Sequence, residues 1–154
     1  DGIEILLVDD EKGFVETLAK RLRQRGFTVH CAFSGTEALD RLEKEETIDL
    51  VVLDVKMPEL DGIETLIKIK KMRPLVEVLM LTGHSEIKSA VEALKFGAFD
   101  YTTKPCDLND LVSIAKQAVS RKKKRESKVL DARMKPYISK RERDEIISDV
   151  LEED

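Results

Sequence analysis

Acidic, hydroxyl and ammonium side chains follow four separate apolar runs of this 154-residue chain. Asp9 and Asp10 come directly after one run, Asp54 follows a second, and Thr82 and Lys104 follow two more. If the runs are parallel strands of one sheet, these five side chains meet at the edge where the strands end. Carboxylates at one edge repel each other and need a cation. A few oxygen ligands suit Mg²⁺, which also bridges to phosphate oxygens.

Asp54 is the candidate nucleophile of this group. An aspartate is already ionised at neutral pH, and its carboxylate can attack phosphorus to form an aspartyl phosphate. Such a transfer needs in-line positioning and neutralisation of the phosphoryl oxygens rather than acid–base chemistry. Mg²⁺ and Lys104 supply positive charge in this interpretation, and the Thr82 hydroxyl supplies a hydrogen bond. The sequence therefore predicts a phosphoryl-accepting site whose reactive residues are Asp54, Lys104 and Thr82.

Each of these residues has a simpler interpretation when it is taken alone. Asp9 or Asp10 fits a helix N-cap, Thr82 fits a turn, and Lys104 fits a solvated surface lysine. The coincidence at four strand ends favours the acceptor site.

Two other functions on a similar fold remain as alternatives, and both fit the sequence less well. A hydrolytic phosphatase with an aspartate nucleophile generally has a second acid two positions later, where this chain has Lys56. A flavin-binding module needs a phosphate cradle after the first strand, and an acidic sequence at 9–11 repels phosphate.

The elements that must position this chemistry alternate regularly along the chain. Five apolar runs are separated by segments with apolar residues at helical spacing. This alternation predicts an α/β fold, a doubly wound parallel sheet with helices on both faces. Gly26 predicts the end of the first helix, because glycine takes the left-handed conformation without steric cost. The predicted strands are residues 3–8, 28–32, 48–53, 76–81 and 99–102.

The composition excludes several classes of protein. A hydrophobic content of 42% supports a core, and a net charge of −4 argues against bulk nucleic-acid binding. Cys31 and Cys106 lie far apart, which indicates a reducing compartment, so we expect a cytoplasmic protein. The apolar run at 48–55 already contains Asp49 and Asp54, so we expect no membrane span.

These motifs resemble the response-regulator receiver family of two-component signal transduction. The resemblance covers roughly residues 3–120. It rests on the acidic pair Asp9-Asp10, on Asp54 within Leu-Asp-Val-Lys-Met-Pro, on Leu-Thr-Gly at 81–83, on Asp61-Gly62, and on Asp100-Tyr101 through Lys104-Pro105.

The resemblance implies a five-stranded sheet of order 2-1-3-4-5 and a phosphoryl donor that is a sensor histidine kinase or a phosphotransfer protein. It also implies that Mg²⁺ is held by Asp10, Asp54 and the backbone carbonyl of Lys56, with Asp9 acting partly through water. The protein is then a phosphoacceptor regulator that catalyses only its own phosphotransfer and dephosphorylation.

The resemblance further implies a conformational switch. Thr82 turns toward the phosphoryl group, Tyr101 changes rotamer, and the surface made by the fourth helix, the fifth strand and the fifth helix is remodelled. That surface is then expected to control a partner or a homodimer. The Lys104-Pro105 peptide bond is expected to be cis.

The chain continues beyond the receiver-like part, which we assign to residues 1–120. Residues 121–154 predict a helical extension, in which the fifth helix runs on to about Lys135, Pro136 breaks it, and Ser139 and Glu142 cap a short terminal helix. The apolar stripe is missing between Val119 and Val129, so we expect this middle part to be exposed. The terminal helix folds back, packs on a second subunit, or is the stump of a further domain.

Overall fold

The computed structural model describes residues 2–57 and 60–152, and it contains the predicted five-stranded parallel sheet. The strand order is β2-β1-β3-β4-β5, so the doubly wound fold and its order are confirmed. The strands are β1 (Glu4–Val8), β2 (Thr28–Ala32), β3 (Leu50–Asp54), β4 (Glu77–Thr82) and β5 (Asp100–Thr103).

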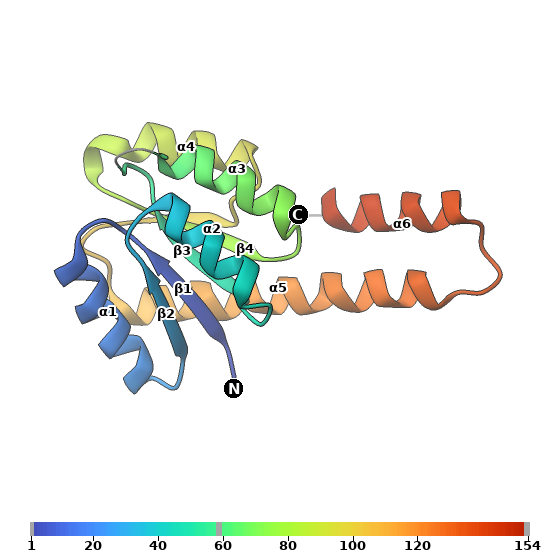
Figure 1. Cartoon of the computed structure of the whole chain (residues 1–154), viewed down its shortest axis with the longest axis horizontal. Helices are drawn as coiled ribbons and strands as arrows, with labels where there is room; N and C mark the ends of the chain where they lie inside the picture. The colour runs from blue at the N-terminus through green and yellow to red at the C-terminus, as the bar shows by residue number, and fades with distance from the viewer. Residues whose placement is uncertain (1, 58–59, 153–154) are drawn as a thin grey trace.

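Helices cover both faces of the sheet (Figure 1). Side chains of alternate strand residues point to opposite faces, so Leu6 and Val8 pack with α2, α3 and α4, whereas Ile5 and Leu7 pack with α1 and α5. Both faces of the sheet are therefore buried beneath helices, as expected for a parallel sheet. The helices are α1 (Lys12–Gln24), α2 (Gly35–Lys44), α3 (Gly62–Met72), α4 (Ile87–Lys95), α5 (Leu108–Met134) and α6 (Lys140–Glu152), with a short 3₁₀ helix η1 (His84–Glu86).

The carboxyl ends of β3 and β4 lie one residue beyond the predicted runs. Asp54 is the last residue of β3 and pairs in register with Leu81, while Thr82 is the last residue of β4 and pairs with Thr103. Apolarity defined the predicted runs, but the hydrogen-bond ladder continues into these polar residues. Asp54 and Thr82 therefore belong to the sheet itself, whereas Asp9, Asp10 and Lys104 follow the ends of β1 and β5.

The turn after β3 packs closely against the start of α3. Asp61 caps α3, because its carboxylate accepts a hydrogen bond from the Glu64 backbone N–H at 2.9 Å. A Cβ on Gly62 would lie 2.2 Å from the backbone oxygen of Asp54. Only glycine fits this contact, which fixes the chain directly behind Asp54. Gly26 has φ +93° and ends α1, as predicted.

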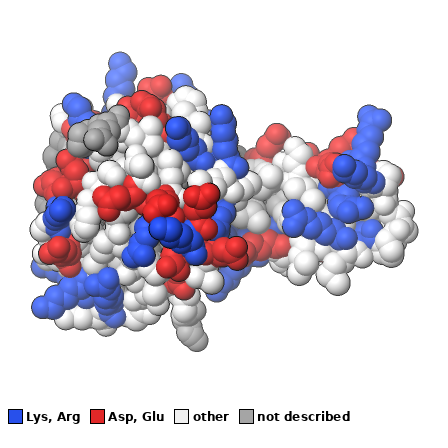
Figure 2. All heavy atoms as spheres, viewed as in Figure 1, with Lys and Arg blue, Asp and Glu red and all other residues white. Residues whose placement is uncertain are grey.

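The C-terminal extension is a helical hairpin that projects from the α/β body (Figure 1). The hydroxyl of Ser139 accepts a hydrogen bond from the Glu142 backbone N–H at 3.1 Å, which is the predicted cap of α6. Helix α6 folds back along α5 and buries Val150, so the first of the three expected arrangements is present. Figure 2 shows Lys and Arg side chains gathered towards the far end of this hairpin.

The middle of α5 was predicted to be exposed, which is correct for most of its residues but wrong for the face that meets the body. Lys122 is only 8% exposed and Arg125 only 6%. Lys122 pairs with Asp49 at 3.1 Å, and Arg121 pairs with the fully buried Glu77. The sequence shows no apolar stripe here because charged groups, rather than hydrophobic ones, attach this part of α5 to the body. No helix among the described residues has both the length and the apolarity needed to cross a membrane.

Candidate functional site

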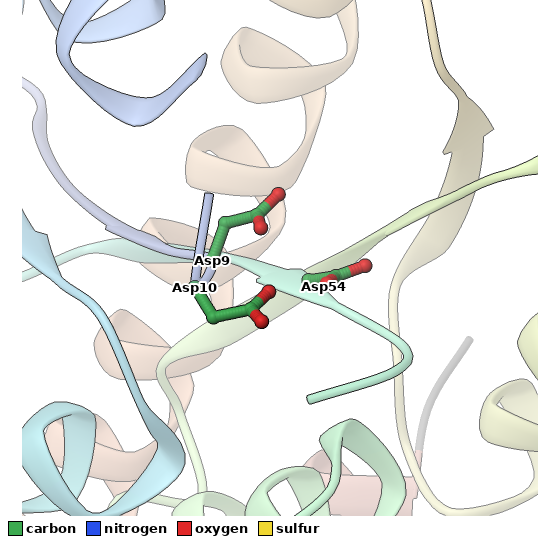
Figure 3. A group of neighbouring side chains, drawn as sticks. All are labelled: Asp9, Asp10 and Asp54. Carbon is green, nitrogen blue, oxygen red and sulfur yellow. The ribbon is translucent and has the colours of Figure 1, made fainter. Parts of the chain in front are cut away.

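Three carboxylates meet at the carboxyl edge of the sheet. Asp9 and Asp10 follow β1, Asp54 ends the neighbouring β3, and oxygen atoms of the three lie within 4.8 Å of one another. Figure 3 shows their carboxylates projecting to the same side of the strand ends. Asp9 and Asp54 are buried, whereas Asp10 is exposed. The structure thus brings together the acids that the sequence singled out.

Asp9 uses both of its carboxylate oxygens within the protein. One accepts the Glu11 backbone N–H at 3.0 Å, and the other lies 2.6 Å from the Lys104 ammonium. The residue in the N-cap position of α1 is Glu11, and its side chain makes no capping hydrogen bond. The simple N-cap interpretation of Asp9 and Asp10 therefore does not describe this edge. Burial raises the pKa of Asp9 in spite of the hydrogen bond from Lys104.

Lys104 lies at the centre of the acidic group rather than in solvent. Its ammonium is 2.6 Å from Asp9, 3.0 Å from Glu11 and 3.8 Å from Asp54, and its side chain is 19% exposed. Burial lowers the pKa of Lys104, but the hydrogen bonds to Asp9 and Glu11 and the charge of Asp54 outweigh this and raise it. Lys104 is therefore held in its charged form. The Lys104–Pro105 peptide bond is cis, as the resemblance implied.

Asp54 is the acid whose ionisation the site opposes most clearly. Burial, together with the nearby charge of Asp9, raises the pKa of Asp54 from 3.8 to about 7, although Lys104 and a hydrogen bond from the Lys56 backbone N–H oppose the rise. One ammonium is too little positive charge for this group of acids. A further cation at this point would favour the ionised carboxylate.

The donor set fits Mg²⁺. Carboxylate oxygens are its preferred protein ligands, and it uses few of them because it retains several waters. Asp10 is exposed, whereas Asp9 accepts a backbone hydrogen bond with one oxygen and lies beside the Lys104 ammonium with the other. That Asp9 acts partly through water stays an expectation. The backbone carbonyl of Lys56 remains an expected ligand. Pro58 of the same motif lies outside the described residues.

The two residues expected to form the switch lie on adjacent strands. Thr82 is fully buried at the end of β4, and its hydroxyl donates to the Gly83 carbonyl at 3.1 Å. Tyr101 lies on β5 beside Met80 and is half-buried against the core that contacts α2, α3 and α4. Thr82 follows Leu81, the register partner of Asp54.

Sequence reasoning missed two residues that contact Lys104. Glu11 pairs with the ammonium, and the ring of Phe14 lies beneath it with its centroid 4.8 Å away. Phe14 also packs against the core beneath α1. Glu11 and Phe14 are three residues apart, so they lie on the same face of a helix. That spacing, directly after the acidic pair, is the signal that could have identified them.

The comparison with known proteins agrees with this geometry. Residues 5–116 match the family described as response regulator receiver domain. The transcriptional regulatory protein ZraR from Escherichia coli K12 is 43% identical over 120 residues, which are 78% of this chain and 27% of ZraR. This chain thus spans about a quarter of the length of the curated relatives it matches.

Solved structures give the same result. A response regulator receiver domain protein from Clostridium thermocellum is 38% identical with a TM-score of 0.76, covering 79% of this chain and 97% of that one. NtrX from Brucella abortus, in complex with ADP, is 31% identical with a TM-score of 0.79, covering 94% of this chain and 32% of that one. The sheet order, the acidic edge and these matches together place the chain in the response regulator receiver family of two-component signalling.

Proposed function

We propose that this receiver domain is a switch that accepts a phosphoryl group on Asp54. The observation that carries the proposal is the meeting of three carboxylates within 4.8 Å with an ammonium 3.8 Å from Asp54. An Asp54 carboxylate oxygen forms the new bond to phosphorus, while the bond from phosphorus to the donor breaks and the leaving group keeps its electron pair. The donor is the phosphohistidine of a sensor histidine kinase or of a phosphotransfer protein.

Lys104 donates a hydrogen bond to the transferred group and balances part of its charge. Asp10 and Asp54, with the Lys56 carbonyl and with Asp9 through water, would hold Mg²⁺. The bound ion would supply positive charge next to the phosphoryl oxygens. Burial and the charge of Asp9 raise the pKa of Asp54, and a cation bound here would favour its ionised form.

Thr82 and Tyr101 carry the signal away from Asp54. The Thr82 hydroxyl exchanges its bond to the Gly83 carbonyl for one to a phosphoryl oxygen, and Tyr101 turns into the space that Thr82 leaves. The affected surface consists of α4, β5 and α5. It already exposes apolar side chains of α4, among them Val91 and Leu94. A surface of this kind suits a protein partner or a second copy of the chain.

The same proposal divides the chain into a receiver at 1–120 and an extension at 121–154. The domain is a phosphoacceptor regulator of the cytoplasm and catalyses only its own phosphotransfer and dephosphorylation. Because ZraR is a transcriptional regulatory protein, DNA contact belongs to other parts of a longer protein rather than to these residues.

Homodimers form through α4, β5 and α5 or through the hairpin. Light scattering on the full chain and on residues 1–122 tests this, and monomers throughout, with and without phosphorylation, contradict it.

The phosphoryl site is tested by measuring the intact mass after incubation with acetyl phosphate. Wild type is expected to gain one phosphoryl group only when Mg²⁺ is present, and Asp54→Asn is expected to gain none. Asp40→Asn is the matched control, because Asp40 is an exposed acid on α2 that pairs with Lys44 far from the strand ends. An adduct that persists in Asp54→Asn rules out this acceptor. The absence of any adduct, also with a phosphorylated kinase, rules out the proposed chemistry.

A further inference from the structure

The ammonium of Lys104 already lies beside two carboxylates before any phosphoryl group arrives. It has three N–H donors, and the carboxylates of Asp9 and Glu11 lie at hydrogen-bonding distance from it. Asp54 is farther away, at 3.8 Å, which is an ion pair but too long for a hydrogen bond. Contact with a phosphoryl group on Asp54 therefore requires the ammonium to turn an N–H towards it. Something must hold the ammonium in place during that exchange.

Glu11 is the partner that gives way. Its side chain is 66% exposed, whereas that of Asp9 is 3% exposed. An exposed ion pair is weakened by water and salt, so it is exchanged easily. Asp9 is also fixed by the Glu11 backbone N–H. As Lys104 turns from Glu11 towards the phosphoryl oxygens, it would lose one of its two close contacts.

The Phe14 ring holds Lys104 in a different way. The ammonium lies 4.8 Å from the ring centroid, within the range of a cation–π attraction. This attraction acts on the whole charge and uses no particular N–H, so it persists while the hydrogen bonds change. The ring itself is fixed, because Phe14 lies in the first turn of α1 and packs against the core that includes Val15 and Leu18.

We propose that Phe14 is a positioning residue for phosphotransfer, which keeps the Lys104 ammonium next to Asp54 while its hydrogen bond passes from Glu11 to the phosphoryl group. This inference rests on the proposed function of Asp54. Helix α1 then contributes to the reaction through the aromatic ring of Phe14, in addition to the acids that precede the helix. Phe14 acts through Lys104 and does not touch the reacting atoms.

The rate of adduct formation from acetyl phosphate and Mg²⁺ tests the proposal in the full chain. Phe14→Leu keeps an apolar side chain but removes the ring face, and we expect it to slow phosphorylation between about twofold and thirtyfold. Phe14→Tyr keeps the ring and is expected to restore the rate to within about twofold. Phe33→Leu is the matched control. Phe33 packs against the same core and has its own lysine, Lys12, with the ammonium 5.3 Å from the ring centroid.

A second measurement needs no phosphorylation. A proton above the face of an aromatic ring has its NMR resonance shifted upfield, so the side-chain methylene signals of Lys104 should be displaced in wild type. Phe14→Leu should return them to ordinary lysine positions, whereas Phe33→Leu should leave them displaced. Thermal unfolding of each variant separates a lost contact from a damaged fold, and Phe14→Tyr covers the case in which Phe14→Leu unfolds.

The outcomes separate the two proposals. A wild-type rate in Phe14→Leu overturns the role of Phe14 and leaves the acceptor Asp54 intact. An equal loss in Phe14→Tyr and Phe14→Leu also overturns it, because the ring face would then be irrelevant. Unshifted Lys104 signals in wild type refute the contact itself. If wild type gains no phosphoryl group from any donor, the proposed function fails, and the role of Phe14 in phosphotransfer fails with it.

Discussion

The surroundings of Asp54 favour the binding of a cation or a phosphoryl group, but they lower the stability of the fold. Its side chain is 10% exposed and faces the charge of Asp9, so its ionised form is poorly solvated. Lys104 compensates only in part, because it is shared with Asp9 and Glu11. The same crowding that makes the edge attract Mg²⁺ therefore acts against folding when no cation is bound.

We predict that Asp54→Asn stabilises the fold near neutral pH in the presence of a chelator, by about 2 kcal/mol. The pKa of Asp54 rises from 3.8 to about 7 on folding, so the folded state binds more protons than the unfolded state between these values. Stability contributed by this group consequently falls as the pH rises from about 4 to about 7. Urea denaturation of both proteins measures the difference, which should shrink when Mg²⁺ is added. A less stable variant under chelation contradicts the prediction.

Lys70 gives a pH dependence of opposite sign at the other end of the sheet. Burial lowers the pKa of Lys70 from 10.5 to about 8, although the charge of Glu77 opposes this and Arg121 and Arg125 add to it. Between these values the folded protein has released a proton that the unfolded chain still holds. The free energy of unfolding should therefore rise with pH over this window, by at most about 1.4 kcal/mol per unit.

The difference between wild type and Lys70→Met isolates this contribution, because other lysines titrate in the same range. Denaturation at several pH values between about 8 and about 10.5 should give curves that converge or cross. If the two plots of unfolding free energy against pH run parallel, Lys70 has the same pKa in the folded and the unfolded state, and the prediction is wrong.

The sequence was sufficient to predict that the polar side chains at the strand ends meet, because parallel strands bring their carboxyl ends to one edge of the sheet. Asp9, Asp54 and Lys104 were found in this way. Contacts made by Glu11 and Phe14 could not be predicted as firmly, because they depend on how α1 is turned against the sheet. That rotation is set by packing among many core side chains, which short-range patterns do not encode.

At the scale of the elements, α5 is attached to the sheet by charges. The guanidinium of Arg121 makes two hydrogen bonds to Glu77, the first residue of β4, and Lys70 of α3 lies 3.9 Å from the same carboxylate. Lys122 joins α5 to Asp49, whose other oxygen accepts the Glu4 backbone N–H at 2.9 Å. These pairs occupy the edge opposite the acidic site.

We predict that Glu77→Gln lowers the free energy of unfolding by about 3–5 kcal/mol. Glu77 is fully buried, so its loss leaves Arg121 and Lys70 close together without the negative charge between them. Urea denaturation measures the effect. Asp40→Asn removes an exposed acid whose pair with Lys44 is 3.0 Å long, and should change stability by about 0.5 kcal/mol or less. Equal effects in the two variants contradict the prediction.

The predicted elements were reliable where the pattern was apolar and failed where polar groups took its place. The strand at 28–32 was predicted without error. The other four predicted strands began one or two residues early, and the third to fifth stopped one residue short of the observed last residues, Asp54, Thr82 and Thr103. The prediction that the middle of α5 is exposed failed on its body-facing side for the same reason. A buried charge has no hydrophobic signature, and its partners Glu77 and Asp49 are distant in the sequence.

The whole molecule is an α/β body with a projecting hairpin, and the two parts are packed very differently. The body has two extensive cores, whereas α6 has one buried side chain, Val150, and packs along α5. Its other apolar residues are partly exposed, and Leu130 and Met134 of α5 are 59% and 71% exposed. Fewer buried apolar contacts therefore stabilise the hairpin than stabilise the sheet.

We predict that α6 opens locally without unfolding of the body. In hydrogen exchange followed by mass spectrometry, the amides of α6 should exchange much faster than those of β3 and β4. Trypsin should cut first at Lys140 or Arg141, two exposed basic residues at the start of α6. Protection of α6 equal to that of β4 would mean that hairpin and body form one cooperative unit.

Because α5 is one continuous helix, its length sets the direction in which the rest of the hairpin faces. A helix turns about 100° per residue, so one residue inserted between Arg125 and Val129 would rotate the rest of the hairpin by that angle about the helix axis. Seven inserted residues would restore the facing to within about 20° and carry the hairpin about 10 Å outward. Chains of this type should therefore tolerate changes of whole heptads in α5 far better than single insertions, and their lengths should differ in steps.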